Sequence, residues 1–340
     1  MTPSDQPDTA GDAATDADAS RSTRDRLCFA AAWLVALAAI APSIAAWSAR
    51  LHWTFDLWTA FPLHRTIVAG FAAVIAMLLR VRSAATVAGV VAILSGASFV
   101  GAMGRVVTVA QPEQTLRVMS ANILTGNAEF ESFESLIRAD PPDILAVLET
   151  NAAWAADLER LGDLYPHRLS LPREDNFGLA LLSRIAWESA GRTTLDGARG
   201  DVPSIEARYV IDGRPLTVIA THPLPPVGSW NWGSRNDQLR RIAARVATLD
   251  HAAIVMGDLN TPPWSPFYGD LLAGGGLRDT RAIAAGTSPT WHARRRWMRT
   301  PIDYVLHTSE LGAIDHRTQR IAGSDHFAVR ARLAWRLAGD

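Results

Sequence analysis

Eight polar residues in the last two-thirds of the chain have side chains suited to hydrolytic chemistry. Each carries a carboxylate, an amide or an imidazole at or beside the end of a short apolar run: Asn122, Glu149, His222, Asp258, Asn260, Asp303, Asp325 and His326. Because strand ends gather at the rim of a sheet, side chains that are far apart in sequence can share one site there. Taken singly, each residue could be a turn former or a helix cap, so the prediction rests on their combination.

These residue types fit the hydrolysis of a phosphoester. Mg²⁺ prefers carboxylate and amide oxygens, which Glu149, Asn122 and Asp325 supply. A histidine beside a carboxylate transfers protons or stabilises negative charge, and His326 with Asp303 offers such a pair. Phosphoester hydrolysis needs a metal, an oriented water and donors for the developing charge. The sequence therefore predicts a divalent-metal-dependent phosphoesterase.

The elements expected to position these residues are short strands that alternate with amphipathic helices. Strands are predicted at residues 116–121, 144–148, 179–182, 205–211, 216–221, 253–256, 302–307 and 327–333, and helices at 130–139 and 235–249. Many strands with interspersed helices indicate an α/β domain with layered sheets. We expect this domain to span residues 116–340, after a linker at 106–115.

Six segments resemble, in this order, the motifs of the endonuclease/exonuclease/phosphatase superfamily: Ser120-Ala121-Asn122, Leu148-Glu149, Thr221-His222, Gly257-Asp258-Leu259-Asn260, Ile302-Asp303-Tyr304 and Gly323-Ser324-Asp325-His326. The fourth and sixth segments are fairly specific when they occur together at this separation with the upstream Asn and Glu. The resemblance covers about residues 116–335. It implies a four-layer α/β/β/α sandwich with two central mixed sheets, and hydrolysis of phosphodiesters, phosphomonoesters or diphosphates with Mg²⁺ or Mn²⁺.

The resemblance also implies a role for each residue by its position. Glu149 looks like the principal metal ligand, with Asn122 and Asp325 beside it. Asp258 resembles the residue that orients or deprotonates the attacking water. Asn260 resembles the amide that holds a water or a phosphate oxygen.

The histidines resemble the groups that handle charge and protons in this superfamily. His326 looks like the histidine that contacts the phosphate, oriented by Asp303. His222 matches a second histidine that some branches use to protonate the leaving group. The division of acid and base roles among Asp258, His222 and His326 stays open.

Two groups of side chains near these motifs are candidates for substrate binding: Trp230, Trp232, Arg294, Arg295 and Arg296. The tryptophans are expected in a loop at 223–232, where packing against the domain is the alternative role, although Trp also favours membrane interfaces. The arginines precede Asp303. An Arg run is usually a solvated face, but clustered Arg can bind a diphosphate or an anionic headgroup.

The first hundred residues differ in composition from the rest. Residues 1–26 form a polar segment that we expect to be a disordered cytoplasmic tail. Transmembrane spans are predicted at about 27–49, 64–82 and 83–104, because crossing a bilayer takes about 20 apolar residues. The middle segment is marginal in length, and a re-entrant or amphipathic hairpin is its alternative.

Arginines decide the predicted orientation of these spans, because the richer side faces the cytoplasm. With three spans, five arginines fall on the side of the N-terminus and three on the other: Arg21, Arg24, Arg26, Arg80 and Arg82 against Arg50, Arg65 and Arg105. A multi-pass protein of the cell membrane with an extracytoplasmic catalytic domain is therefore predicted. If the middle segment does not cross, the domain faces the cytoplasm instead.

The net charge of the predicted domain gives information about the class of its substrate. From Arg117 onward the chain has 25 arginines against 26 acidic residues, and it has no lysine. A domain that grips nucleic acid through its phosphates is usually distinctly basic, so a nucleic acid is the less favoured partner. The only cysteine, Cys28, lies in the first predicted span and does not indicate a redox compartment.

The preferred hypothesis is a membrane-anchored enzyme that hydrolyses a phosphorylated lipid or another phosphoester. The segment Pro262-Pro263-Trp264-Ser265-Pro266 and the N-terminal spans resemble a membrane-anchored bacterial branch of the superfamily, of the glycopeptide-resistance-associated type. Some members of that branch are thought to act on polyprenyl diphosphate carriers, which makes a lipid-linked phosphate or diphosphate the expected substrate. The alternatives are a membrane-anchored nuclease and a non-catalytic binding protein that retains the fold. The sequence indicates no protein partner.

Overall fold

The chain is described by a computed structural model over residues 9–104, 114–193, 195 and 202–336. It divides into two compact units. One unit comprises residues 1–47 and 62–99, and the other comprises residues 48–61 and 100–340. Most of the expected linker at 106–115 lies outside the described residues.

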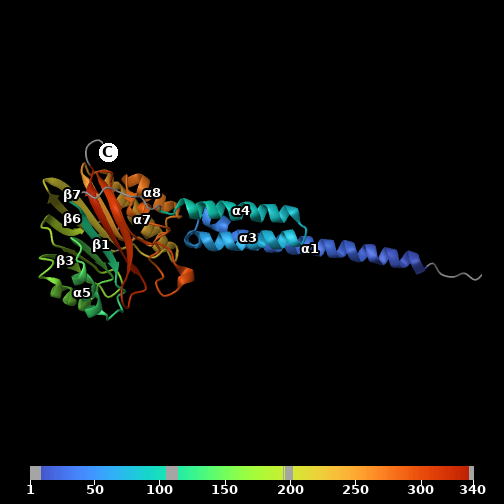
Figure 1. Ribbon diagram of the computed structural model, residues 1–340, viewed down its shortest axis with the longest axis horizontal. Helices are drawn as coiled ribbons and strands as arrows, with labels where there is room; N and C mark the ends of the chain where they lie inside the picture. Colours follow the sequence, from blue (N-terminus) through green and yellow to red (C-terminus); the bar gives the residue numbers. More distant parts are fainter. Residues whose placement is uncertain (1–8, 105–113, 194, 196–201, 337–340) are drawn as a thin grey trace, which may run out of the picture. The chain divides into compact units, whose positions relative to one another are not determined.

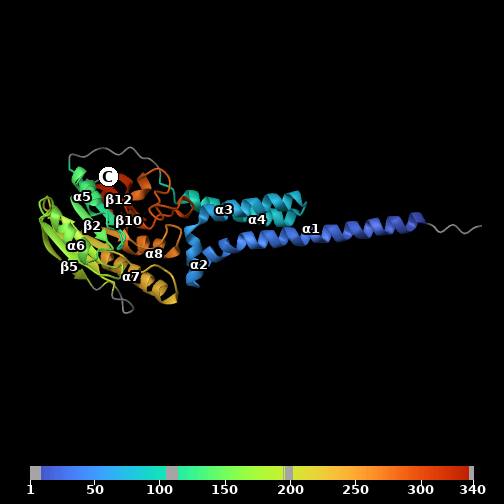
Figure 2. The same ribbon diagram turned by 90° about the horizontal axis from the view of Figure 1, so that it is seen from below.

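Three long helices make up the first unit: α1 (Thr9–Trp47), α3 (Pro62–Leu78) and α4 (Arg82–Gly101). Small residues such as Ala36, Ala72 and Ala84 form their shared core, which lets helix backbones approach closely. Figure 2 shows α3 and α4 side by side. Two of these helices, α1 from Ser20 onward and α4, are long and apolar enough to cross a membrane.

The middle helix differs from the predicted span. Helix α3 covers residues 62–78 and reaches the length of a span only together with the preceding helices at 53–60, from which it is bent by 86°. It ends short of residue 82 because the chain turns at Arg80, whose φ of 63° lies in the left-handed region. Within the described residues, two apolar helices could therefore cross, or three if the bent pair is one span.

The N-terminal tail also differs from its prediction. We expected no regular structure in residues 1–26, but α1 begins at Thr9. Several alanines lie in this stretch, and alanine is the best helix former. Extending an existing helix costs far less than nucleating a new one, so the apolar part of α1 can propagate into the tail.

Two six-stranded sheets form the centre of the second unit (Figure 1). The strand order of the first is β11-β12-β1-β2-β4-β3, with β1 (Leu116–Asn122), β2 (Ile144–Leu148), β3 (His167–Leu171), β4 (Leu179–Ser183), β11 (Leu311–Arg320) and β12 (Phe327–Trp335). The order of the second is β5-β6-β7-β8-β10-β9, with β5 (Trp187–Thr193), β6 (Ser204–Ile211), β7 (Arg214–Thr221), β8 (Ala252–Asp258), β9 (Arg278–Asp279) and β10 (Asp303–His307). Both sheets are mixed, since β1 and β2 are parallel, β7 and β8 are parallel, and the other neighbours are antiparallel.

Helices cover the outer face of each sheet. The larger ones are α5 (Phe130–Ala139) and α6 (Ala152–Leu158) on the first sheet, and α7 (Ser229–Ala247) and α8 (Pro266–Gly275) on the second. Shorter helices are α2 (Trp53–Leu57) and the 3₁₀ turns Trp58–Ala60, Glu159–Leu161, Thr280–Ile283 and Arg296–Met298. The expected α/β/β/α arrangement with two central mixed sheets is confirmed.

The cores follow the two-residue period of the strands. In β8, Ile254 and Met256 point into the core between the sheets, whereas Ala253 and Val255 pack under α7 and α8. Because both faces of β2 and β8 are covered, these two strands are apolar along their length. Their carboxyl ends lead to the polar residues Glu149 and Asp258.

Helix α7 corrects one sequence prediction. It begins at Ser229 rather than at Arg235, so Trp230 and Trp232 lie on its first turns and not in a loop. Trp232 packs edge-on against Phe267 of α8, with ring centroids 5.6 Å apart. This contact holds the two helices together and explains why the helix starts earlier than its apolar periodicity indicates.

Candidate active site

Four of the eight candidate residues come from two pairs of parallel strands. Asn122 ends β1 and Glu149 directly follows β2, and Asn122 is in register with Leu148. His222 follows β7 and Asp258 ends β8, which is parallel to it. Parallel strands end at the same sheet edge, and the two sheets face each other, so both pairs of side chains meet at one rim.

Gly257 allows Asp258 to approach His222. Its φ of +149° is in the region that favours glycine, and a Cβ placed there would lie 1.8 Å from the backbone oxygen of Thr221. Any other residue would therefore push β8 away from the end of β7. With glycine present, His222 Nε2 lies 3.5 Å from Asp258 Oδ2.

Ser324 fixes the loop that carries the last two candidates. Its hydroxyl donates a hydrogen bond of 2.8 Å to the backbone oxygen of Asn122 and accepts one of 2.9 Å from the backbone N–H of His326. These bonds hold Asp325 and His326 against the end of β1. The serine in this motif thus has a structural reason to precede them.

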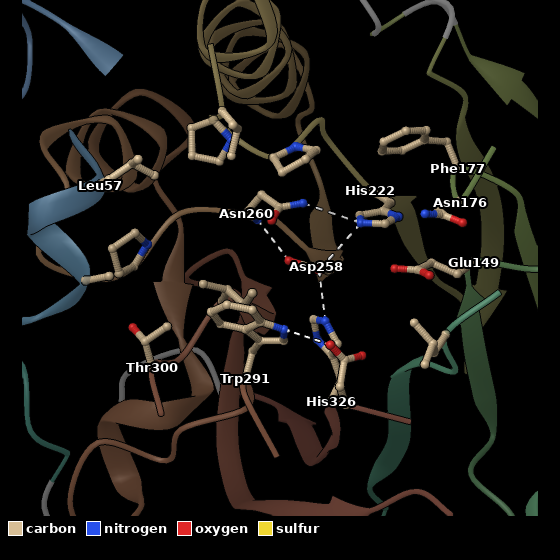
Figure 3. Close-up of a pocket in the computed structure, with 18 of the residues that line it drawn as sticks. Leu57, Glu149, Asn176, Phe177, His222, Asp258, Asn260, Trp291, Thr300 and His326 are labelled. Atoms are coloured by element: carbon tan, nitrogen blue, oxygen red, sulfur yellow. Dashed lines mark hydrogen bonds and ion pairs between the residues drawn. The ribbon is translucent and has the colours of Figure 1, made fainter. Parts of the chain in front are cut away.

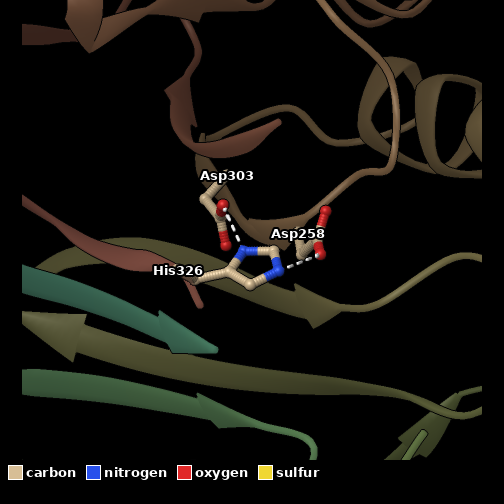
Figure 4. A group of neighbouring side chains, drawn as sticks. All are labelled: Asp258, Asp303 and His326. Carbon is tan, nitrogen blue, oxygen red and sulfur yellow. Dashed lines mark hydrogen bonds and ion pairs between the residues drawn. The ribbon is translucent and has the colours of Figure 1, made fainter. Parts of the chain in front are cut away.

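His326 lies between two buried carboxylates (Figure 4). Asp258 and Asp303 are direct partners on the antiparallel strands β8 and β10. His326 Nδ1 is 2.9 Å from Asp303 Oδ2, and its Nε2 is 3.8 Å from Asp258 Oδ2. One side of the imidazole is held by Asp303, while the other side faces Asp258.

The electrostatics of this cluster favour charged histidines. Burial lowers the pKa of His326, but the charge and hydrogen bond of Asp303 outweigh burial and raise it to about 10. For His222, burial is likewise outweighed by its bond to Asp258, and the pKa is raised. Burial raises the pKa of Asp303, whereas the two histidines overcome burial at Asp258 and lower its pKa. These pKa shifts favour the protonated forms of both histidines and the ionised form of Asp258, whereas burial opposes ionisation of Asp303.

Glu149 occupies a backbone conformation that is unusual for its type. Its φ is 65°, in the left-handed region, which costs a non-glycine residue about 1 kcal/mol or more. One carboxylate oxygen accepts a 2.9 Å hydrogen bond from the Asn122 amide, and the other accepts a 3.0 Å bond from the backbone N–H of Thr125. Such strain is retained where the surrounding structure demands a particular side-chain direction.

The residues around Glu149 fit a hard divalent cation. Asp325 Oδ1 is buried without a hydrogen-bond partner among the described residues, while its Oδ2 accepts a 3.0 Å bond from Trp291 Nε1. A buried, unpaired carboxylate oxygen is costly unless a cation neutralises it. The carboxylates of Glu149 and Asp325 could supply oxygen ligands to Mg²⁺ or Mn²⁺. Asn122 could add its amide oxygen, which accepts a 3.1 Å bond from the backbone N–H of Leu124.

A second donor set is geometrically suited to an ion. One ligand atom each from Asp258, Asp303 and His326 lie within 4.8 Å of one another. However, His326 Nδ1 is already bonded to Asp303, and an imidazole must be neutral to ligate a metal. The raised pKa of His326 therefore makes this cluster better suited to proton transfer and phosphate binding than to holding the ion.

The cluster opens into a cavity of about 360 Å³ (Figure 3). Figure 3 shows His222, Asp258 and His326 pointing toward one another, with Glu149 and Asn260 beside them. Asn260 is held by a 2.9 Å bond from its side-chain amide to the backbone oxygen of Pro223. The rest of the lining is largely apolar and comes from several segments: Leu57, Ala60, Leu124, Phe177, Pro225, Pro226, Val227, Pro262, Trp291 and Ile302.

Sequence reasoning missed several of these lining residues. Asn176 and Phe177 lie in the loop before β4, and the Phe177 ring is 5.2 Å from the His222 ring. Leu57 and Ala60 belong to the segment between α1 and α3. None of them stands in a recognisable motif, and only the folded chain places them at the site.

The five candidates for substrate contact are not part of the cavity lining: Trp230, Trp232, Arg294, Arg295 and Arg296. The three arginines are exposed, and Arg294 donates to the backbone oxygen of Gly323. Their contact with a substrate stays a prediction, and the loop that carries the arginines contributes Trp291 and Thr300 to the cavity lining.

The α/β/β/α sandwich and the acidic, histidine-containing rim of its strands define a class of metal-dependent phosphoesterases and nucleases. The chain belongs to the Endonuclease/Exonuclease/phosphatase family, whose profile matches residues 119–326. The matched range begins in β1 and ends at His326, so it contains all eight candidate residues. No curated protein matches the chain.

Solved structures share the fold at low sequence identity. An endonuclease/exonuclease/phosphatase from Beutenbergia cavernae is 22% identical, with a TM-score of 0.54 over 66% of this chain and 72% of that one. A family member from Bacteroides vulgatus is 17% identical, with a TM-score of 0.55 over 66% of this chain and 100% of that one. D. rerio TDP2 complexed with single-strand DNA product is 15% identical, with a TM-score of 0.55 over 65% and 100%.

Proposed function

We propose that this protein is a membrane-anchored, divalent-metal-dependent phosphohydrolase that acts on a lipid-linked phosphate or diphosphate, such as a polyprenyl diphosphate. One observation carries the proposal: the carboxylate and imidazole cluster opens into a cavity whose other walls are largely apolar. A phosphate ester joined to a hydrocarbon likewise combines a charged group with an apolar chain. The near-neutral charge of the domain also favours such a substrate over a nucleic acid.

The metal would be held by Glu149, Asn122 and Asp325. When bound, Mg²⁺ or Mn²⁺ supplies Lewis-acid stabilisation of the phosphoryl oxygens. Asp258, whose carboxylate lies between the two histidines, would orient the attacking water and accept its proton. Asn260 provides an amide donor for a water or a phosphoryl oxygen.

The two histidines would act on different oxygens of the substrate. His326, held by Asp303, presents a positive charge to the phosphoryl oxygens as negative charge develops. His222 donates its proton to the leaving oxygen when the phosphorus–oxygen bond breaks. The imidazole of His222 is buried and lies against Phe177, so bulk water does not compete for this proton.

We further propose a multi-pass arrangement with the catalytic domain outside the cytoplasm. The candidate spans and the larger number of arginines on the N-terminal side support this orientation. A reporter fused after Asp340 tests it. Activity of an exported-only reporter is expected, and activity of a cytoplasm-only reporter would contradict it.

The activity itself is tested with the full chain in lipid nanodiscs. Prenyl diphosphates, phospholipids and DNA are offered separately with Mg²⁺ or Mn²⁺, and phosphate release or strand cleavage is measured. We expect turnover of a lipid phosphate and little cleavage of DNA. Robust DNA cleavage without lipid turnover would overturn the proposal in favour of a membrane-anchored nuclease.

A further inference from the structure

The segment between α1 and α3, residues 48–61, belongs to the same compact unit as the catalytic domain. It contains helix α2 and the 3₁₀ turn Trp58–Ala60. Three of its residues, Asp56, Leu57 and Ala60, line the cavity that holds the candidate catalytic groups. A connection between two apolar helices thus contributes directly to the wall of the active site.

Asp56 anchors this segment through a buried ion pair. Its Oδ2 accepts from Arg235 of α7, and its Oδ1 accepts a 2.8 Å bond from the hydroxyl of Ser265, which caps α8. Asp56 is 2% exposed and Arg235 is 0% exposed. Both carboxylate oxygens are occupied, so Asp56 is not available to a metal or a substrate, and its role is to hold the segment in place.

Arg235 connects this anchor to the catalytic groups. Its Nη1 donates a 3.2 Å hydrogen bond to the backbone oxygen of Asn260, and its guanidinium lies 5.3 Å from the centre of the Phe267 ring. Removing Asp56 would leave a fully buried arginine without its counter-charge, which is strongly unfavourable. The buried pair therefore couples the position of the segment to the loop that carries Asn260.

The side chains that the anchor presents to the cavity are apolar. Leu57 directly follows Asp56, and Ala60 lies one 3₁₀ turn later. The cavity lining also includes Pro225, Pro226 and Val227. Nothing in this wall can hydrogen-bond a phosphate through its side chain, but each residue can bury methylene groups of a ligand.

The exposed side of the same segment is also apolar. Phe55 is 36% exposed and Trp58 is 43% exposed. Tryptophan and other aromatic residues favour the water–membrane interface. This segment is joined in the chain directly to α1 and α3.

We propose that residues 53–60 form the subsite for the hydrocarbon chain of the substrate, with Leu57 and Ala60 in contact with the part of the chain that a short-chain ester lacks, and that Asp56 is a positioning residue that holds this subsite on the domain. This inference rests on the proposed function and specifies how that site selects a lipid. The active site is complete only when the connection between α1 and α3 is docked. Specificity for a lipid then depends on the anchor as well as on the catalytic domain.

Chain-length preference tests the subsite. The full chain in nanodiscs or detergent is assayed with Mn²⁺ on two phosphate esters that share one head group, one with a long prenyl chain and one with a short water-soluble chain. We expect the wild type to prefer the long chain, and Leu57→Asn to lower the long-to-short ratio of kcat/KM about tenfold, since a few methylene contacts are lost. Leu51→Asn is the matched control, because Leu51 is on the same segment, is 76% exposed and does not line the cavity. It should leave the ratio unchanged.

The anchor is tested in the same assay. Asp56→Asn should raise KM for the long-chain ester by more than it lowers kcat, whereas Asp270→Asn, which removes the exposed 2.6 Å pair with Arg50, should change neither. If Asp56→Asn fails to fold, the Leu57 variant still decides the question.

The possible outcomes separate the two proposals. The subsite alone is overturned if the wild type prefers the long chain and Leu57→Asn keeps that preference. It is also overturned if Leu57→Asn lowers the activity on both esters equally. A wild type that hydrolyses only the short ester also overturns the subsite but leaves a phosphoesterase. A wild type that hydrolyses no lipid phosphate at all overturns the proposed function itself.

Discussion

Asp258 and Asp303 lie directly opposite each other on the antiparallel strands β8 and β10, and His326 bridges their carboxylates. Two buried carboxylates this close would repel each other if both were ionised without a neighbouring cation. The imidazolium of His326 between them relieves that repulsion. This arrangement makes the protonation of His326 depend on Asp303.

Asp303→Asn is expected to lower kcat by about a hundred- to ten-thousandfold, because His326 loses the group that orients and charges it. The pH profile gives a more specific test. The pKa of His326 is raised to about 10, above its usual value near 6.5, so the required cation should persist through neutral pH in the wild type. In the variant, the basic limb of kcat/KM should move down toward pH 6.5. An unchanged limb would show that His326 does not act as a cation.

Glu149→Gln keeps the shape of the side chain but removes the charge that attracts a metal. Thermal unfolding of the wild type should shift to higher temperature on addition of Mn²⁺, since a ligand that binds only the native state stabilises it by about 2.7 kcal/mol at a concentration of 100 Kd. The variant should fold with no such shift. A metal-induced shift of equal size in both proteins would remove Glu149 from the metal site.

Gly257→Ala should destabilise the domain by more than about 3 kcal/mol, because its Cβ would lie 1.8 Å from the backbone oxygen of Thr221. Gly213→Ala is the matched control. Gly213 also has a positive φ, +74°, but a Cβ there meets nothing within 4 Å, so the expected cost is about 1 kcal/mol. Free energies of unfolding of the two variants compare these directly. Equal losses would contradict the close approach of β8 to β7.

His316 should make the domain sensitive to acid. Burial lowers its pKa to about 4, and Thr280 Oγ1 lies 2.9 Å from its Nδ1. Between pH 6.5 and pH 4 the unfolded state therefore binds a proton that the folded state does not, and stability falls with pH by about 2 kcal/mol from pH 7 to pH 5. His316→Gln, referenced to its own stability at pH 8, should lose most of this slope. An equally steep decline in the variant would place the acid sensitivity in another group.

The sequence predicts the central strands of the two sheets well and the edge strands poorly. Central strands such as β2 and β8 are apolar on both faces and end at functional residues, so their pattern and their ends are readable. The edge strand β11 pairs only with β12 and is half-buried along most of its length, which leaves little apolar alternation to detect. For the same reason β3 and β5, at the other edges, have no clear signal.

The sequence likewise predicts some parts of the site and not others. The eight motif residues could be identified because their types and order are specific, and the structure brings them to one rim. The wall at residues 53–60 could not be identified, because it depends on a buried pair between Asp56 and Arg235, which are 179 positions apart in the chain. Trp230 and Arg294 are candidates from residue type alone, and they lie outside the lining of the cavity, on the first turn of α7 and in the loop after Trp291.

The most direct test of this account measures product release from a long-chain prenyl diphosphate in nanodiscs, with the wild type and Glu149→Gln assayed side by side, each with Mn²⁺ and with chelator. We predict that the wild type releases product, that chelator abolishes this release and that added Mn²⁺ restores it. Product release by the variant should be at least a thousandfold slower. Release that is independent of metal, or equal in the two proteins, would contradict it.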